Sequence, residues 1–581
     1  MGTISDKLMR IINTKEDIRQ ALISKGYDVP TSIPFKEYAK MILDLPCNAD
    51  SFPDIEGIVA RYSASDLTNE QMATNPVWVD KTGNGHDIQL KNFSWKGMSG
   101  VGGYVGDFSK WVNNRDTTEI GITKSNSKVI IDVKVSQGSG KNIVFISKSN
   151  LGISNNVTIK ITSTYPEGVM KFANSASNKY LKLPSNGIIT LQDNPEYTSN
   201  EMHLHLASAD LGQITIEQLP LYPGALVFDG VDDYGVCDNF PIPTKEKGYT
   251  VVVLRQWITR GKGALGLVSN VKDWLHDGAF LLEYRNIQAD HLNKPISFGA
   301  IGSEMDLPHI LTYQTSKSYN GVSITTGNFE GTDVLHVGKL APTNVGTCIN
   351  TAIWELVFLD HDATEEELAK IKDYFVKTYP WLFPDQAWTV TGKTNEDEDR
   401  ATIANITGNG NNLVLSNFGF VEGSGYNEEG QYAGYLVTDG VDDKIASSDF
   451  KMGKDFTIVG DWKFIDNKKS GTGLVKGSSF YIYNTMIGLD LYINSGSVKN
   501  SLDGIKSINA ACSDGRAYDR NWNEILANTG NVVGSGGMLE VSSSGGRFDR
   551  IAFKNLAIYP RILSKDDCIK AYNYLQTLKS K

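Results

Sequence analysis

Two stretches of the chain, FDGVDDYGVCD at Phe228–Asp238 and TDGVDDKIASSD at Thr438–Asp449, carry the letters D-G-V-D-D at positions 210 residues apart. Such a repeat arises when a site is duplicated, or when a whole domain is duplicated together with its turns. A second pair decides between the two, since TGNGHDIQLKNF at Thr82–Phe93 returns as TGNGNNLVLSNF at Thr407–Phe418. Motifs repeated in a fixed order indicate a duplicated domain.

Each copy closes with an apolar strand, a turn and an amphipathic helix, in AIWELVFLDHDATEEELAKIKDYF and RIAFKNLAIYPRILSKDDCIKAYNYL. Thr364, followed three residues later by Glu367, predicts a capped helix start. Ser564 and Asp567 repeat this pattern in the second copy. T-G-N-G and D-G are turn signals, because Gly, Asn and Asp tolerate strained backbone angles, and the alternating segments beside them predict half-buried strands. Both copies are therefore expected to be mainly β.

The first copy contains an insertion. Its T-G-N-G motif lies 325 residues before the second one, whereas the D-G-V-D-D motifs are 210 residues apart, so 115 residues are extra. The inserted segment alternates apolar and polar residues in KVIIDVKVS and VTIKITST. We therefore expect an inserted β-sandwich domain over residues 112–222, at a loop tip where insertion is tolerated.

The ordered motifs VDKTGNGHDIQL, FDGVDDYGV and IAFKNLAIYPRILSKDD resemble those of the laminin-G-like, concanavalin-type sandwich family. The resemblance implies tandem concanavalin/laminin-G-like jelly-roll sandwiches. The first covers residues 57–111 and 223–380 and is discontinuous; the second covers 385–581. We call them the first and second copy. The fold hosts many unrelated functions, so the resemblance alone does not identify a ligand.

Residues 1–46 differ from the rest of the chain. Apolar residues and one lysine recur at four- and three-residue spacing, as in a heptad seam, at Ile4, Leu8, Ile11, Lys15, Ile18 and Leu22. Two interpretations stay open: a two-helix hairpin that packs on itself or on the body, and a helical stem that self-associates or docks on a partner. We expect an N-terminal helical anchor or oligomerisation segment.

The segment TKEDIRQALISKGYDVPTSIPFKEYAKMI resembles an N-terminal part of bacteriophage tail and fibre proteins, and NFSWKGMSGVGGY with QLPLYPGALVFDGVDDYGVCDNFPI resembles virion proteins of crAss-like gut phages. These resemblances imply a structural virion protein, a fibre or appendage on head or tail, made in the host cytoplasm. Its N-terminal helices would bind other virion proteins, and the chain would form a homo-oligomer, a trimer. Alternatives are a bacterial surface protein that binds carbohydrate or processes polysaccharide, and a pure scaffold without ligand.

Composition excludes some classes of partner. The net charge of −11 argues against a nucleic-acid binder and against docking on an anionic membrane. No stretch of 18 apolar residues predicts membrane insertion, and the N-terminus does not read as a secretion signal. The cysteines are odd in number and form no C-x-x-C pair, which argues against a disulfide framework or structural zinc: Cys47, Cys237, Cys348, Cys512 and Cys568.

Catalytic carboxylates are not evident. Glycosidases on this fold place acidic residues alternately on one strand, where they supply a nucleophile and an acid. The nearest stretch, SEMDLPH, has Glu304 and Asp306 but Pro308 at the third position. The sequence therefore predicts that the chain is not an enzyme.

Two sets of residues are candidates for binding. Aromatic residues in Gly-rich or polar segments of the first copy could form a sugar platform, although aromatics in a sandwich more often belong to the core: Trp95, Tyr104, Trp111, Trp257 and Trp274. Aspartates of the two D-G-V-D-D turns could bind calcium, although such aspartates usually bond to their own backbone: Asp229, Asp232, Asp439 and Asp442. No cofactor is expected to be required; calcium and a host surface glycan are the candidate ligands.

Overall fold

The structure is a computed structural model of the 581-residue chain. It describes Lys15, Arg19 and residues 52–105, 107–110, 112–113, 120–135, 143–147, 157–165, 170–174, 180–182, 185–191, 202–206, 211–244, 246–259, 265–270, 281–284, 297–298, 311–323, 332–339, 348–465, 472–476, 480–484, 488–493, 502–503, 508–526, 535–541, 543–544 and 547–580. The predicted N-terminal helices therefore lie almost wholly outside the described residues. All sheets below belong to one compact unit, residues 56–365 and 375–581.

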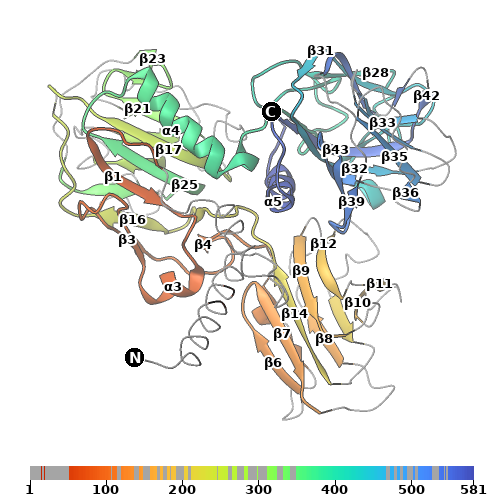
Figure 1. The fold of residues 1–581 in the computed structure, drawn as a ribbon, viewed down its shortest axis with the longest axis horizontal. Helices are drawn as coiled ribbons and strands as arrows, with labels where there is room; N and C mark the ends of the chain where they lie inside the picture. The colour runs from red at the N-terminus through yellow and green to blue at the C-terminus, as the bar shows by residue number, and fades with distance from the viewer. Residues whose placement is uncertain are drawn as a thin grey trace, which may run out of the picture. The chain divides into compact units, whose positions relative to one another are not determined.

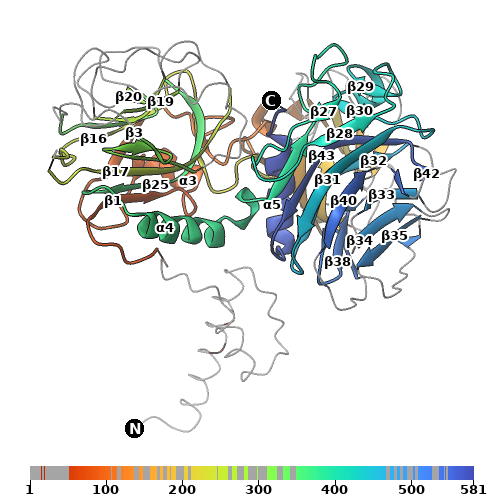
Figure 2. The ribbon, with the colours of Figure 1, turned by 90° about the horizontal axis from the view of Figure 1, so that it is seen from above.

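The first copy contains an eight-stranded antiparallel sheet in the order β23-β22-β21-β17-β25-β15-β4, with β1 also paired to β25. Its strands are β1 (Ile58–Ser63), β4 (Gly100–Val101), β15 (Leu226–Asp229), β17 (Thr250–Trp257), β21 (Leu311–Thr315), β22 (Ser318–Tyr319), β23 (Val322–Ser323) and β25 (Asn350–Leu359). Figures 1 and 2 show β1, β17 and β25 side by side. All eight residues of β17 are buried, as expected for a central strand.

The second sheet of this copy has seven strands in the order β2-β3-β16-β24-β18-β19-β20, antiparallel except for the β19–β20 pair. The strands are β2 (Val77–Trp78), β3 (Ile88–Lys91), β16 (Tyr234–Cys237), β18 (Leu265–Ser269), β19 (Leu281–Tyr284), β20 (Ser297–Phe298) and β24 (Leu335–Val337). The two sheets share one core, in which the rings of Tyr62 and Trp78, one from each sheet, lie 5.6 Å apart. Burial of such large rings is the main stabilising contribution to a sandwich.

The second copy repeats this plan. One sheet has the order β29-β30-β43-β32-β37-β38-β39 with β26 on β43, and the other has the order β27-β28-β31-β40-β33-β34-β35-β36. The strands are β26 (Gln386–Thr389), β27 (Thr402–Ile403), β28 (Leu413–Ser416), β29 (Gly425–Asn427), β30 (Tyr435–Val437), β31 (Lys444–Met452), β32 (Thr457–Phe464), β33 (Thr472–Lys476), β34 (Phe480–Asn484), β35 (Gly488–Ile493), β36 (Leu502–Asp503), β37 (Ile508–Cys512), β38 (Arg516–Asp519), β39 (Glu524–Leu526), β40 (Ser535–Val541) and β43 (Ile551–Tyr559). Trp388 is fully buried in its core.

Strand register relates the two copies residue by residue. Thr250 pairs with Leu359 in the first copy, as Thr457 pairs with Tyr559 in the second. A β-bulge follows at the same place in both, between Leu254 and Arg255 and between Asp461 and Trp462. Because a bulge breaks the ladder at one position, its repetition fixes the alignment. Counterparts named below follow from this register.

The inserted segment forms two five-stranded antiparallel sheets, in the orders β11-β10-β13-β8-β5 and β12-β9-β14-β7-β6. The strands are β5 (Val112–Asn113), β6 (Ile120–Lys124), β7 (Lys128–Val133), β8 (Ile143–Ser147), β9 (Val157–Ser163), β10 (Met170–Asn174), β11 (Tyr180–Lys182), β12 (Asn186–Leu191), β13 (Met202–Leu206) and β14 (Gly212–Gln218). Figure 1 shows β7, β14 and β9 in neighbouring positions. Along β7, Val129, Ile131 and Val133 are buried, as the alternation predicts.

Three α-helices lie among the described residues: α3 (Asn69–Thr74), α4 (Glu365–Thr378) and α5 (Lys565–Gln576). Ser564 accepts a hydrogen bond from the backbone N–H of Asp567 at 3.1 Å, so it caps α5 as the sequence predicts. No helix among the described residues is long and apolar enough to span a membrane. The prediction of a mainly β chain with several antiparallel sheets is confirmed. The jelly-roll topology, the helical stem and the domain bounds stay predictions.

Candidate ligand-binding pocket and aspartate turns

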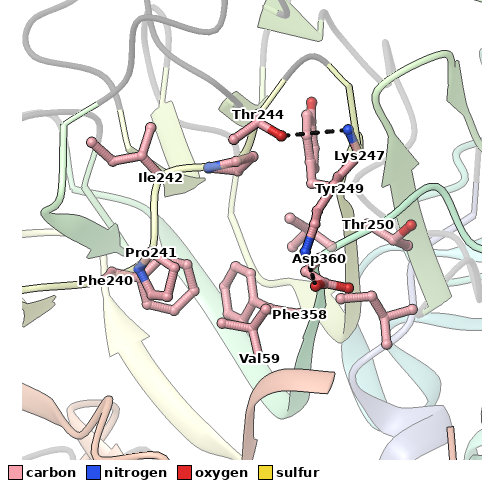
Figure 3. Close-up of a pocket in the computed structure, with 13 residues that line it drawn as sticks. Val59, Phe240, Pro241, Ile242, Thr244, Lys247, Tyr249, Thr250, Phe358 and Asp360 are labelled. Atoms are coloured by element: carbon pink, nitrogen blue, oxygen red, sulfur yellow. Dashed lines mark hydrogen bonds and ion pairs between the residues drawn. The ribbon is translucent and has the colours of Figure 1, made fainter. Parts of the chain in front are cut away.

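A pocket of about 230 Å³ opens in the first copy, where the start of β17 meets the end of β25 (Figure 3). The residues that line it come from three separate parts of the sequence: Val59, Phe240, Pro241, Ile242, Pro243, Thr244, Lys247, Tyr249, Thr250, Val251, Phe358, Leu359 and Asp360. Ligand pockets are typically apolar with a few polar groups at fixed places, and this one has that composition.

The inner part of the pocket is aromatic. Phe240 and Phe358 are buried and meet edge to face, with ring centroids 4.8 Å apart. Tyr249 is 2% exposed, and its hydroxyl accepts a hydrogen bond from Gln314. Figure 3 shows Val59 beside Phe358. These rings belong to the core as well as to the pocket, so they are held rigidly.

Two charged side chains lie at the mouth. Lys247 Nζ is 3.2 Å from a carboxylate oxygen of Asp360, and the two side chains are 68% and 42% exposed. The pKa of Asp360 is lowered: burial raises it, but hydrogen bonds from His361 and Lys247 outweigh that effect. An exposed pair contributes at most about 1 kcal/mol to stability. Lys247 and Asp360 can therefore give up their contact with each other and with water for contacts with a ligand at little cost in free energy.

One wall is the loop between β16 and β17. Gly248 donates its N–H to the carbonyl of Thr244 at 2.9 Å, which closes the loop. Gly248 has a φ of +76°, and a Cβ there would lie 2.7 Å from the carboxyl carbon of Asp362. Only glycine fits both constraints. Ile242, 44% exposed, stands on this loop above the aromatic rings.

The second copy lacks the parts that build this wall. The copies are offset by 210 residues at D-G-V-D-D and by 207 at Thr250 and Thr457, so the loop of the second copy is three residues shorter. The counterpart of Asp360 is Pro560, which carries no charge. The counterpart of Phe358 is Ile558. An aromatic ring and the ion pair thus distinguish the first copy.

The two D-G-V-D-D turns have the same internal bonding. In the first copy, the N–H of Val231 donates to Asp229 Oδ1 at 2.8 Å, and the N–H of Asp229 donates to Asp233 Oδ2 at 3.0 Å. The other oxygen of Asp233 accepts from Ser99 Oγ at 3.0 Å. These bonds are what aspartate supplies in tight turns. Asp232 is exposed.

The second turn matches it. Asp439 accepts from the N–H of Val441 at 2.8 Å, and Asp443 accepts from the N–H of Asp439 at 2.8 Å and from Ser424 Oγ at 3.1 Å. Asp442 is exposed. Burial raises the pKa of Asp443 to about 6, against hydrogen bonds that lower it.

Three carboxylates in each turn could face one cation. Asp229, Asp232 and Asp233 each offer an oxygen within 4.8 Å of the others, and the second turn does the same. Calcium takes six to eight oxygens, whereas the oxygens of Asp229 and Asp233 already accept backbone and hydroxyl protons. The buried third aspartate, Asp233 or Asp443, was not among the predicted residues, although its place in both repeats was visible.

The aromatic candidates are dispersed. Trp95 is half-buried and stacks on Phe93, with centroids 4.9 Å apart. Tyr104 is half-buried; burial, then Glu217 and Glu70, raise its pKa to about 12. Trp257 is only 4% exposed and lies in the core beneath the guanidinium of Arg255.

Trp111 and Trp274 lie outside the described residues. Of the three aromatic candidates that the structure describes, Trp95, Tyr104 and Trp257, none lines the pocket. The sequence signal that could have pointed to it is the extra Pro-Ile-Pro segment, which appears only in the first copy.

No protein-family model and no curated protein matches the chain. Among solved structures, domain 4 of AbnA, a GH43 extracellular arabinanase from Geobacillus stearothermophilus, in complex with arabinotriose, aligns at 12% identity over 32% of this chain and 98% of its own, with a TM-score of 0.22. Trypanosoma rangeli sialidase in complex with sialic acid aligns at 10% identity over 81% of this chain and 86% of its own, with a TM-score of 0.25.

One expectation is corrected by these alignments. The sequence predicted that the chain is not an enzyme, but the aligned structures include a domain of a glycoside hydrolase and a sialidase, so that prediction is withdrawn. TM-scores of 0.25 and below assign no activity or ligand to this chain. The chain is thus similar, at low identity and low TM-score, to proteins whose structures hold sugars.

Proposed function

We propose that the chain is a glycan-binding protein made of two laminin-G-like sandwiches, and that it serves as a fibre or appendage of a bacteriophage virion. One observation carries the binding function: the pocket of the first copy, with its aromatic interior and its Lys247–Asp360 pair at the mouth. The virion setting rests on the N-terminal and first-copy resemblances in the sequence.

The chemistry of the pocket suits a sugar ring. A pyranose has apolar C–H faces and a rim of hydroxyls, each of which both donates and accepts hydrogen bonds. Pro241 and Ile242, which both line the pocket and are exposed, offer apolar surface to a ring face. Lys247 offers only donors and Asp360 only acceptors, so together they satisfy both sides of neighbouring hydroxyls.

Charge narrows the class of glycan. The ammonium of Lys247 and the carboxylate of Asp360 cancel at the mouth. A strongly acidic sugar would have to compete with Asp360 for Lys247, whereas a neutral sugar bonds to both. We therefore propose a neutral hexose unit within a host surface polysaccharide. Weak single sites are sufficient on a particle that carries many copies, because effective concentration raises avidity.

Binding is tested with the full-length chain on a glycan array, followed by titration calorimetry with the best neutral oligosaccharide. Lys247→Met and Asp360→Asn each remove a charge-assisted hydrogen bond, worth about 1.5–3 kcal/mol, so affinity is expected to fall by at least about tenfold. Lys454→Met changes the exposed counterpart in the second copy and serves as the matched control. Equal affinity of all three variants and the natural chain would rule out the pocket. If the chain bound no glycan on the array, the result would favour the alternative of a structural scaffold without a ligand.

The setting is tested separately. Mass spectrometry of purified virions is expected to detect this chain, through contacts of residues 1–46 with other virion proteins. Its absence from virions, together with its presence on a bacterial surface, would favour the bacterial carbohydrate-binding alternative.

Light scattering is expected to give a trimer for the full chain and a monomer for a chain starting at Asp50. A monomer in both would refute the stem.

A further inference from the structure

A histidine without a hydrogen-bond partner lies on the outer face of the seven-stranded sheet of the first copy, the face that points away from the core. Leu335 and Val337 belong to the core, so His336 between them points to the opposite face of β24. His336 is 3% exposed, and neither of its ring nitrogens has a hydrogen-bond partner among the described residues. Buried polar groups are usually hydrogen-bonded, so this imidazole calls for a partner.

A lysine lies on the same face. Cys237 belongs to the core, so Tyr234 and Val236 of β16 point outward. Val236 pairs directly with His336, which makes Tyr234 a diagonal neighbour of the imidazole. Lys339 Nζ lies 4.6 Å from the centroid of the Tyr234 ring. Lys339 is 9% exposed, and it makes no hydrogen bond or ion pair with any residue that the structure describes.

The bend after β24 brings Lys339 back over the sheet. Gly338 has a φ of +77°, and its N–H donates to the carbonyl of Leu267 at 2.8 Å. A Cβ at Gly338 would lie 2.5 Å from a ring carbon of Phe228, so only glycine fits this bend. The backbone therefore sets the position of Lys339, which has no ion pair of its own to hold it there.

The second copy has a carboxylate on the matching face. Strand register makes Lys444 the counterpart of Tyr234 and Glu540 the counterpart of His336. Lys444 Nζ lies 3.1 Å from Glu540 Oε1. The cation on this face is thus neutralised within the second copy, whereas Lys339 of the first copy has no carboxylate partner among the described residues.

We propose that His336 and Lys339 form an anion site, which binds a ligand oxyanion that has a hydroxyl group beside it. An ammonium has three donors, and a neutral imidazole has one donor and one acceptor. An oxygen of the anion would accept from Lys339 and from the N–H of His336, while the hydroxyl of the ligand would donate to the other ring nitrogen. The carboxylate of an acidic sugar and a phosphate monoester share this chemistry. Water would satisfy the imidazole, but it would not neutralise the charge of Lys339.

The charge of the site selects an anion over a metal ion. Burial, and then the charge of Lys339, lower the pKa of His336 to about 4, although Asp238 raises it. The imidazole is therefore neutral at pH 7 and keeps both its donor and its acceptor. Lys91, exposed and directly opposite Tyr234, adds a second positive charge to this face. A zinc site needs several ligands, whereas here a single imidazole lies beside cations.

The unpaired groups have a cost in the ligand-free chain. A buried ammonium and a buried imidazole without partners destabilise the folded state, because both lose their hydration. Lys339→Met keeps the apolar stem and removes the charge. Without an anion present, this variant is therefore expected to melt at the same temperature as the natural chain or higher. If Lys339 had only a structural role, the variant would melt earlier.

The test is titration calorimetry of the full-length chain at pH 7, with inorganic phosphate and with glucuronate as probes. Ionic strength is held constant, because salt screens exposed charges. We expect both anions to bind and to raise the melting temperature. Lys339→Met and His336→Glu, which installs the carboxylate of the second copy, are each expected to weaken binding by at least about tenfold. Lys454→Met removes an exposed lysine of the second copy and is the matched control.

The two probes distinguish the sources of the anion. Tighter binding of glucuronate would identify an acidic sugar as the ligand, and tighter binding of phosphate would identify a phosphate monoester. The pocket proposed for neutral glycan contains neither His336 nor Lys339, so a failure of that proposal does not affect this test.

Two results would overturn the anion site. One is the absence of binding of either probe to the natural chain. The other is unchanged affinity in both Lys339→Met and His336→Glu, or a loss of the same size in Lys454→Met. The melting temperature of each variant shows whether it is folded, and the measurement on the natural chain does not depend on any variant.

Discussion

Ser99 Oγ lies 3.0 Å from a carboxylate oxygen of Asp233. The second copy repeats the contact between Ser424 and Asp443 at 3.1 Å. In each turn the last aspartate is therefore the buried one, which ties the D-G-V-D-D turn to the preceding strand region. The D-G-V-D-D stretch that revealed the duplication is therefore a structural turn. Its buried hydrogen bond to serine is made by Asp233 or Asp443, which were not among the predicted site residues.

This burial makes stability depend on pH. Burial, against hydrogen bonds from Asp229 and Ser99, raises the pKa of Asp233 from 3.8 to about 7. A raised folded-state pKa means that the folded chain binds the proton more tightly than the unfolded chain does. The stabilisation of the folded chain by this proton is therefore complete below pH 4 and is lost as the pH rises through 7. Asp233→Asn is expected to flatten the fall in unfolding free energy of the first copy between pH 5 and pH 8, measured by urea denaturation.

The matched control is Asp232→Asn, which makes the same change at the neighbouring exposed residue. It is expected to change the slope between pH 5 and pH 8 much less than Asp233→Asn does, because the charge of Asp232 raises the pKa of Asp233 less than burial does. If Asp233→Asn kept the natural slope as well, the carboxyl of Asp233 would not be the titrating group.

Chelation gives a second test of the turns. The oxygens of Asp229 and Asp233 already accept internal hydrogen bonds, so removal of calcium is expected to leave the melting temperature unchanged. Thermal melts with EDTA and with millimolar calcium check this. A rise of several degrees with calcium, lost in Asp232→Ala, would instead make these aspartates ligands.

A buried ion pair supports the first copy alone. Arg61 Nε lies 3.3 Å from Glu355 Oε2, and the Tyr379 hydroxyl donates to the other oxygen at 2.7 Å. Burial raises the pKa of Glu355 to about 7, although Arg61 lowers it. The second copy has Ala387 and Asn555 at the counterpart positions.

Arg61→Ala leaves a buried carboxyl without its cation, so a loss of about 3–5 kcal/mol in unfolding free energy is expected, larger at pH 8 than at pH 5. Arg61→Ala with Glu355→Asn reproduces the second copy and is expected to lose less than the single variant, because no buried charge remains. Urea denaturation at both pH values measures the difference. A double variant with a lower free energy of unfolding than Arg61→Ala would contradict this account.

Local chemistry was readable from the sequence. Gly83 and Gly408 have the positive φ values, +77° and +73°, that the T-G-N-G turns predict, and β3 buries alternate residues as its pattern predicts. Long-range proximity was not readable. Val59 and Phe358 line one pocket although they are 299 residues apart in the sequence. The alternation of apolar and polar residues in either strand does not predict that these two strands lie side by side.

Burial of aromatics was equally unreadable. Trp257 ends a strand that is buried on both faces, so its polar surroundings in sequence did not indicate exposure.

The pocket wall gives the last prediction. Gly248→Ala adds a Cβ that would lie 2.7 Å from Asp362, at a backbone φ of +76° that costs about 1–2 kcal/mol for a residue with a side chain. The loop must shift, and with it Thr244 and Lys247, so glycan affinity in calorimetry is expected to fall together with the melting temperature. Gly453→Ala is the control: that glycine lies in the shorter loop of the second copy, with nothing within 4 Å of an added Cβ, and both quantities should stay unchanged. A Gly248→Ala chain that melts earlier yet binds as the natural chain does would place the sugar elsewhere than this pocket.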